Sequence, residues 1–302
     1  MTKILLQVED LCVTYSNKKK SLQALRNINL SIFKNEVFGL VGESGSGKST
    51  LASAILGLLQ KPGEITQGRI LYNGEDITKM NEKKHRYLLW EEISYIPQGA
   101  MNCFNPVTRI REQLNDVIKD HGGHNEYKLN EKEIELLIRS MHLNPDVLER
   151  FPHQLSGGMK QRLCLALAIV LNPKLIVADE PTSALDVISQ RIVLETLSKA
   201  RHRLESSIIF IGHDLALQAQ IVDRIGIMFQ GQLVEIGSVN EIFYNPLHVY
   251  TKKLISSVPS IEAIQNLNDI VAKTEMIPNI LKDNGPSSLI EVKPGHFVAQ
   301  SL

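Results

Sequence analysis

The sequence predicts an α/β protein, because short apolar runs typical of buried strands alternate with helical patterns along most of its 302 residues. A second observation is a match to the phosphate-loop pattern G-x-x-x-x-G-K-[ST], which begins at Gly42 between a predicted strand (36–42) and a predicted helix (49–59). A third is a polar helical insert over about residues 107–152. Together they predict a core that binds a nucleoside triphosphate.

The stretch from Gly42 to Thr50 supplies the groups that a triphosphate needs. Its glycines let the backbone curl so that consecutive N–H groups face an anion, and the following helix adds a partial positive charge. Lys48 supplies a full charge for the β- and γ-phosphates, and the Ser49 hydroxyl can hold Mg²⁺. The loop alone leaves open what is done with the nucleotide.

Bulk composition excludes several classes of protein. Lys+Arg (33) balance Asp+Glu (33), so no overall field favours nucleic acid or an anionic membrane. Three cysteines far apart in the sequence suggest neither a disulfide framework nor a metal site, which fits a reducing cytosol. The N-terminus turns acidic too soon for a signal peptide, and the longest apolar runs have about nine residues where a spanning helix needs ~20. We expect any membrane role to act through a partner.

The N-terminal part predicts two hairpins. Residues 4–15 and 22–33 alternate apolar and polar, which predicts an antiparallel hairpin beside the nucleotide core. Tyr15 ends its first strand and has two readings, an aromatic that stacks on adenine or an edge-strand tyrosine. Residues 64–80 predict a second hairpin, turned at Asn73-Gly74.

The middle of the chain predicts a short strand that ends in Gln98, and then the helical insert, broken at 122–123 and 144–145. Ser156 is a candidate N-cap for a helix running to about Leu171. Gly157 and Gly158 expose backbone N–H groups in its first turn, which predicts a second anion-binding helix start without a lysine of its own.

A buried strand over 174–180 ends in two carboxylates. Downstream of a phosphate loop, Asp179 is placed to hold the Mg²⁺ shell and Glu180 to polarise a water for attack on the γ-phosphate. The next buried strand ends in His213, at the same sheet edge, where it could contact a γ-phosphate. We interpret the remaining histidines as structural or exposed.

The C-terminal part predicts a turn at 181–186, a helix over 187–203, a hairpin over 225–237 turned at Gln230-Gly231, and short helices over 239–257 split at Asn245-Pro246. After Pro259 periodic runs become rare. We expect residues 260–302 to form a partly ordered appendage.

Five motifs in fixed order resemble the ATP-binding subunit of an ABC transporter: GESGSGKST, Gln98, LSGGMKQR, LIVADE and His213. The LSGG motif discriminates, because ordinary phosphate-loop GTPases and kinases lack it. The resemblance covers about residues 4–257. It implies an ABC ATPase cassette over 1–258, with a mixed or parallel core sheet, an antiparallel β subdomain and an α-helical subdomain at about 100–165, and a small C-terminal appendage over 259–302.

The resemblance also implies roles for matching residues. Asp179 is similar to the metal-shell carboxylate, Glu180 to the general base and His213 to the switch histidine. Gln98 resembles the residue that touches Mg²⁺ and relays nucleotide state to the transmembrane partner. Ser183 to Asp186 resemble the loop that crosses the dimer interface. The nucleotide-binding residues that the resemblance implies are Tyr15, Gly42, Glu43, Ser44, Gly45, Ser46, Gly47, Lys48, Ser49 and Thr50, with Ser156, Gly157 and Gly158 capping the γ-phosphate of the opposite subunit.

Three further stretches, QGAMNCFNPV, NPLHVYTKKLISSVPS and KPGHFVA, are similar to the dipeptide/oligopeptide/nickel importer branch. That branch implies two permease subunits, a second and homologous ATPase in a heterodimer, an external substrate-binding protein, and a place on the cytoplasmic face of the membrane. Many members carry a cysteine cluster in the tail, some with iron–sulfur. Because no cysteine follows Cys164, that cofactor is not expected.

We therefore expect an ATPase, with ATP and Mg²⁺ as cofactors and no nucleic-acid partner, that powers import of a peptide-like solute by ATP-driven closure of a cassette dimer. The alternatives are an importer motor for a nickel chelate or an oligosaccharide, an exporter motor, and a soluble ABC ATPase acting on DNA or ribosomes. The short insert, single cassette and zero net charge disfavour the soluble enzyme.

Overall fold

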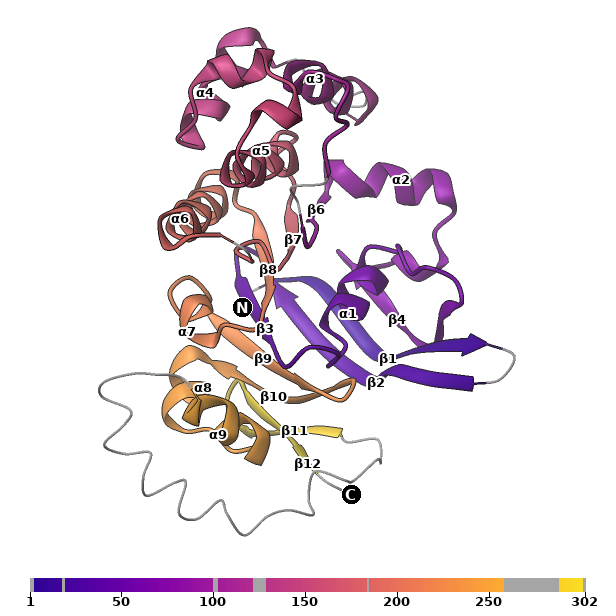
Figure 1. Cartoon of the computed structure of the whole chain (residues 1–302). Coiled ribbons are helices and arrows are strands. Elements are labelled where there is room, and N and C mark those ends of the chain that lie inside the picture. Colours follow the sequence, from indigo (N-terminus) through magenta and orange to yellow (C-terminus); the bar gives the residue numbers. More distant parts are fainter. Residues whose placement is uncertain are drawn as a thin grey trace. The chain divides into compact units, whose positions relative to one another are not determined.

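The computed structural model describes residues 3–17, 20–99, 103–121, 129–183, 185–257 and 288–300. The chain divides into two compact units that alternate along the sequence (Figure 1). Unit 1 comprises Met1–Lys3, Phe33–Val37 and Lys79–Ile211, and unit 2 comprises Ile4–Ile32, Phe38–Thr78 and Gly212–Leu302. The predicted phosphate loop therefore lies in unit 2, whereas Gln98, Asp179, Glu180 and the LSGG stretch lie in unit 1.

Unit 2 contains a four-stranded sheet with the strand order β2-β1-β4-β5. Its strands are β1 (Ile4–Asn17), β2 (Lys20–Phe33), β4 (Gly63–Tyr72) and β5 (Glu75–Asp76). β4 pairs antiparallel with both β1 and β5. In β2 the buried Ile28, Leu30 and Ile32 alternate with less buried residues, as the predicted period of two requires, whereas in β1 consecutive residues such as Leu5 and Leu6 are buried. The turn between β4 and β5 is the predicted one, with positive φ at both Asn73 (49°) and Gly74 (85°).

A second sheet in unit 2 runs in the order β11-β12-β10-β9-β3. β3 and β9 are parallel, and the other neighbours are antiparallel. The strands are β3 (Val37–Val41), β9 (Arg224–Phe229), β10 (Gln232–Ser238), β11 (Ser288–Lys293) and β12 (His296–Gln300), and the helices of this unit are α1 (Lys48–Ile55), α7 (Leu215–Gln218), α8 (Val239–Tyr244) and α9 (Val249–Ser256). The phosphate loop is the connection from β3 to α1.

Unit 1 holds three neighbouring parallel strands in the order β8-β7-β6. They are β6 (Ile93–Ile96), β7 (Leu175–Asp179) and β8 (Ser207–Gly212), and every residue of β7 and β8 is buried. Continuous burial is typical of parallel strands covered on both faces, and it explains why these segments read as unbroken apolar runs. The helices are α2 (Glu82–Glu91), α3 (Ile110–His121), α4 (Glu131–Ser140), α5 (Gly157–Ile169) and α6 (Val187–Leu204), with 3-10 turns at Ile77–Lys79, Pro145–Glu149 and Pro152–Gln154.

Most predicted elements are confirmed, and three differences have physical reasons. The sequence does not predict α2, which has no fully buried side chain and is interrupted by non-helical backbone at Leu89 and Trp90, or α7, which is only four residues long. Within the C-terminal appendage, residues 288–300 form a β hairpin that pairs with β10, although the local pattern there is weak. Two helices end early, at Ile55 and Ile169, followed by positive φ at Gly57 and Asn172. The predicted break at 122–123 lies outside the described residues.

None of the helices in the described ranges combines the length and the apolar character required to cross a bilayer.

β1 carries a bulge that depends on a glycine in β4. Glu9 pairs with Arg69 and Cys12 with Gln67, so two residues of β1 face Gly68 alone. Gly68 has φ 84°, and a Cβ built on it would lie 2.3 Å from the carbonyl oxygen of Glu9. Gly74 has a similar φ of 85°, but a Cβ there would meet nothing within 4 Å.

This pair of glycines separates steric crowding from backbone strain. Gly74→Ala should lower the free energy of unfolding by about 1 kcal/mol, because only the left-handed backbone penalty is added. Gly68→Ala should cost about 3 kcal/mol, because the new methyl group also meets backbone atoms that cannot rotate away. Urea denaturation of both variants measures the difference. Equal losses would show that the bulge accommodates a side chain.

Candidate functional site

The phosphate loop has a backbone that glycine permits. Gly45 and Gly47 have φ values of 80° and 106°, and Gly47 is the N-cap of α1. A Cβ on Gly42 would lie 2.3 Å from the carbonyl oxygen of Met228, so only glycine fits at the start of the loop. The sequence predicts this strand–loop–helix arrangement correctly.

Lys48 is almost fully buried, with 6% of its surface exposed. Its ammonium group donates to the carbonyl oxygens of Gly42 (2.7 Å) and Glu43 (2.8 Å) and to the Ser46 hydroxyl (3.3 Å). A buried cation is stable only when oxygen atoms replace its lost water, and the curled loop provides them. The next residue, Ser49, is exposed in the first turn of α1.

Two contacts hold the loop from the C-terminal part of unit 2. The N–H of Gly231, in the β9–β10 turn, donates to the carbonyl oxygen of Ser46 (2.9 Å). The N–H of Glu43 donates to the hydroxyl oxygen of Tyr250 on α9 (3.1 Å). The sequence does not single out Tyr250, since no local pattern connects it to a loop about two hundred residues earlier.

Tyr15 is half-buried near the end of β1, opposite Gly63 of β4. A Cβ on Gly63 would lie 2.6 Å from its ring, so the ring covers that glycine. β1 lies between β2 and β4, which makes the edge-strand reading of Tyr15 wrong. Stacking on adenine stays a prediction.

In unit 1, two of the predicted catalytic side chains meet. The amide nitrogen of Gln98 donates to a carboxylate oxygen of Glu180 (3.0 Å). Glu180 has φ 49°, a conformation that is rare for a residue with a side chain and that often marks a functional position. The backbone N–H of Glu180 donates to the carbonyl oxygen of Ile211 on β8 (2.9 Å), which fixes the position of the Glu180 backbone.

Asp179, the last residue of β7, is buried and lies beside Tyr95 of β6. Burial, followed by the charge of Asp179 and a hydrogen bond to it, raises the pKa of Tyr95 to about 12. The phenol therefore stays protonated and donates to the carboxylate. Tyr95 is a neighbour of the predicted metal-shell residue that the sequence does not identify, although it lies in the predicted strand before Gln98.

The LSGG stretch begins α5 as predicted. The Ser156 hydroxyl accepts from the N–H of Met159 (3.3 Å), and Ser156 is exposed with Gly157 and Gly158 half-exposed. Further along the helix, buried Gln161 donates to the carbonyl oxygen of Pro181 (2.7 Å). This bond ties the helix to the turn that follows Glu180. The sequence does not identify Gln161 either.

The loop after Gln98 also reaches this helix. The pKa of the Cys103 thiol is lowered, chiefly by a hydrogen bond with the Cys164 thiol of α5, and the pKa of Cys164 is raised well above its usual value by the same bond and by burial. Two thiols that are far apart in the sequence are therefore neighbours.

His213 directly follows β8 and is exposed. The adjacent Asp214 caps α7 by accepting from the N–H of Leu217 (2.9 Å). In the predicted interface loop, Asp186 caps α6 and Ser183 donates to the carbonyl of Glu180, whereas residue 184 lies outside the described residues. No cluster of three or more His, Cys, Asp or Glu side chains suited to a metal occurs within the described ranges.

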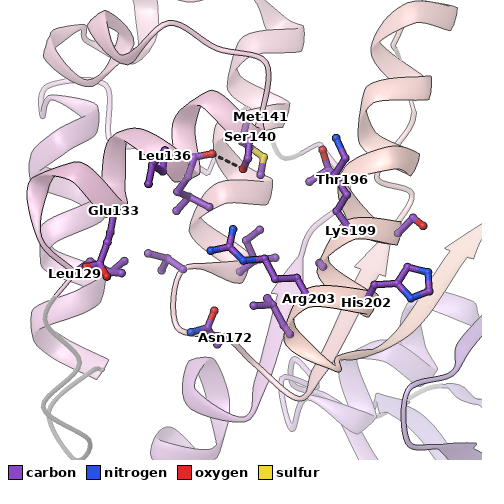
Figure 2. Close-up of a pocket in the computed structure, with 16 residues that line it drawn as sticks. Leu129, Glu133, Leu136, Ser140, Met141, Asn172, Thr196, Lys199, His202 and Arg203 are labelled. Carbon is purple, nitrogen blue, oxygen red and sulfur yellow. Dashed lines mark hydrogen bonds between the residues drawn. The ribbon is translucent and has the colours of Figure 1, made fainter.

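A pocket of about 590 Å³ in unit 1 is separate from these residues. It lies among α4, the end of α5 and α6, and Figure 2 shows Arg203 reaching from α6 into its middle, while the ring of His202 points away. None of the predicted nucleotide, metal or catalytic residues lines it.

Comparison with known proteins agrees with this arrangement. Residues 25–183 match the family described as ABC transporter, and residues 234–284 match the C-terminal region of oligopeptide/dipeptide transporters. Among solved structures, a dimeric post-hydrolysis state of the ATP-binding cassette MJ0796 bound to ADP and Pi has a TM-score of 0.68 at 24% identity, covering 78% of this chain and 99% of that one. An ATP-binding subunit of an ABC transporter has a TM-score of 0.65 at 25% identity, covering 87% and 99%.

Curated relatives are more similar in sequence. The dipeptide transport ATP-binding protein DppD of Caldanaerobacter subterraneus is 42% identical over 86% of this chain and 80% of its own length. The oligopeptide transport ATP-binding protein OppD of Bacillus subtilis is 39% identical over 86% and 73%, and DppD of Escherichia coli 39% over 84% and 78%. The chain therefore belongs to the ABC transporter family as an ATP-binding protein, and it is an ABC-type ATPase.

Proposed function

We propose that the chain is the ATP-hydrolysing subunit of an importer for dipeptides or oligopeptides. The observation that carries this proposal is that the similarity continues beyond the cassette. Residues 234–284 match the C-terminal region of oligopeptide/dipeptide transporters, and relatives 39–42% identical are dipeptide and oligopeptide transport ATP-binding proteins.

In this proposal the loop from Gly42 to Thr50 holds the triphosphate, with Lys48 as its cation and Tyr15 against the adenine. Ser49, Gln98 and Asp179 would hold Mg²⁺, which when bound neutralises phosphate charge. These residues offer a hydroxyl, an amide oxygen and a carboxylate, and the hard cation prefers such oxygen ligands. The amide nitrogen of Gln98 donates its hydrogen bond to Glu180, so the amide oxygen of Gln98 is the atom that would bind a cation.

Glu180 acts as the general base that polarises the attacking water. The Gln98 amide holds its carboxylate, and the bond from Gln161 fixes the turn behind it. His213 contacts the γ-phosphate as the switch histidine. Gln98 then has two tasks, since it orients the base and reports nucleotide state to a permease.

We further propose that two cassettes share each nucleotide. The exposed start of α5 presents backbone N–H groups of Gly157 and Gly158 beside Ser156, on a 13-residue helix whose first turn has no acidic residue. Such a start suits an anion, and Lys160 in the same turn adds a positive charge. It would complement a phosphate loop on a facing subunit. Ser183 to Asp186 would lie at the same interface.

The proposed partners are two transmembrane permeases, a homologous ATPase and an external substrate-binding protein. The chain would sit on the cytoplasmic face of the membrane, docked through the helical insert and the loop after Gln98. Coexpression with neighbouring permease genes, followed by reconstitution in liposomes, tests this function. Dipeptides or oligopeptides should be taken up and should stimulate ATP hydrolysis. Uptake of only a nickel chelate or an oligosaccharide, or outward transport, would refute it.

Lys48→Ala should reduce ATP hydrolysis by about 10²-fold or more, because the main positive charge opposite the phosphates is lost. Phosphate release and binding of a fluorescent ATP analogue measure the effect. Lys20→Ala, at an exposed position of β2, is the matched control and should retain activity. Unchanged turnover of Lys48→Ala would remove the loop lysine from the mechanism.

Glu180→Gln should still bind ATP but hydrolyse it roughly 10²-fold more slowly, because the amide cannot accept a proton from water. The side chain keeps its shape and an oxygen that can accept from Gln98, so the local fold should persist. Size-exclusion chromatography with ATP should then show a trapped dimer. Glu112→Gln, exposed on α3, serves as control, and full hydrolysis by Glu180→Gln would exclude this base.

A further inference from the structure

Tyr250 connects the phosphate loop to the C-terminal region of the chain. It is 2% exposed, its hydroxyl oxygen accepts the N–H of Glu43 (3.1 Å), and its ring packs on Phe229 with 4.3 Å between ring centres. Burial is the main cause that raises the pKa of the Tyr250 hydroxyl, so the side chain that accepts this hydrogen bond is a neutral phenol. Phe229 ends β9, immediately before the turn whose Gly231 bonds to Ser46.

The bond to Tyr250 acts on one particular peptide group. The N–H of Glu43 and the carbonyl of Gly42 belong to the same planar unit, in which the two groups point in opposite directions. The carbonyl side accepts the ammonium group of Lys48 (2.7 Å), while the N–H side is held by Tyr250. Rotation of this peptide would break both bonds, so the tyrosine determines the orientation of a carbonyl that holds the catalytic cation.

The helix that carries Tyr250 is held in turn by a buried carboxylate. Glu235 of β10, which is 0% exposed, accepts the N–H groups of Leu247 (2.8 Å) and His248 (2.9 Å) at the start of α9. These contacts satisfy backbone donors that the helix itself cannot pair. Displacement of Glu235 would therefore release the first turn of α9, where Tyr250 lies.

The C-terminal hairpin (288–300) contacts the carboxylate of Glu235 through His296. The ring of His296 on β12 is 1% exposed and lies between two acids, with Nε2 2.8 Å from Glu235 and Nδ1 3.2 Å from Glu241. Lys293 lies 3.6 Å from Glu241. The hairpin pairs with β10 at the same place, where Glu235 faces Val298. A continuous series of contacts thus runs from the hairpin to the phosphate loop.

We propose that Tyr250 is a positioning residue for the phosphate loop, and that the C-terminal hairpin, through His296 and Glu235, holds the helix bearing it and so sets the nucleotide affinity of the cassette. The inference rests on nucleotide binding by this ATPase and does not depend on the transported solute. It assigns a physical task to Glu235 and Tyr250, which lie within the match to the C-terminal region of oligopeptide/dipeptide transporters (234–284), and to the hairpin that follows this match.

Tyr250→Phe tests the positioning role, since it removes one oxygen atom and leaves the ring against Phe229. Lys48 and its three oxygen partners remain in this variant, so the charge that serves the transition state is retained and only the preorganisation of the loop is weakened. KM and the dissociation constant for ATP should therefore rise roughly three- to tenfold while kcat stays within about twofold. Tyr244→Phe, 79% exposed on α8, is the matched control and should behave as wild type. An unchanged KM, or a loss confined to kcat, would overturn the role. Absence of nucleotide binding by the wild type would instead count against the ATPase function.

Hydrogen exchange of the full chain tests the link to the hairpin. Coupling between two sites is reciprocal, so binding of Mg-ADP should slow amide exchange in residues 288–300 of the wild type. In Tyr250→Phe, at saturating Mg-ADP, that protection should be lost or clearly reduced, while protection of the loop at 42–50 persists. The link would be disproved if Mg-ADP left the amide exchange rate of the hairpin unchanged in the wild type, or slowed it equally in both proteins.

Discussion

A buried ammonium group needs oxygen atoms around it, and the arrangement of unit 2 follows from meeting that need at Lys48. Carbonyl groups of Gly42 and Glu43 face the cation, which requires a curled loop with positive φ at Gly45 and Gly47. A curled loop has few bonds of its own, so neighbouring elements must hold it. The β9–β10 turn and α9 do so, and α9 depends on Glu235 and the C-terminal hairpin.

In unit 1 the predicted metal-binding and catalytic carboxylates are held by neutral hydrogen-bond donors. Each of the two carboxylates at the end of β7 has an uncharged side chain beside it, Tyr95 for Asp179 and Gln98 for Glu180. Neutral donors orient a carboxylate without neutralising it. Glu180 is held in a rare backbone conformation by its bond to Ile211, and strain of this kind persists only where the surroundings enforce it.

The proposed nucleotide site uses the N-terminal ends of two helices, α1 and α5, which offer different groups to an anion. The start of α1 carries Lys48, which is bonded within the phosphate loop, whereas the start of α5 offers the backbone N–H groups of Gly157 and Gly158, with Lys160 in the same turn. In the proposed dimer, an anion shared by the two starts would link two cassettes. The contacts of Gln161 and of the Cys103–Cys164 pair place α5 beside the base and beside the loop after Gln98. The LSGG helix α5 thus contacts the turn after the proposed base and the loop proposed to meet the permease.

By itself, the sequence determined the motif-bearing elements, because the phosphate loop, the capped LSGG helix and the apolar strand ending in Asp179 are local patterns of a few neighbouring residues. It also determined the hairpin turns at Asn73-Gly74 and Gln230-Gly231, where a left-handed backbone favours glycine at the second position and, in the first turn, asparagine before it. Only the tertiary structure decided that β4 lies against β1, that β12 joins β10, and that Tyr95, Gln161 and Tyr250 support the site. The reason is physical: a contact between distant segments depends on how they pack, and a single hydrogen bond leaves no periodic trace in the sequence around either partner.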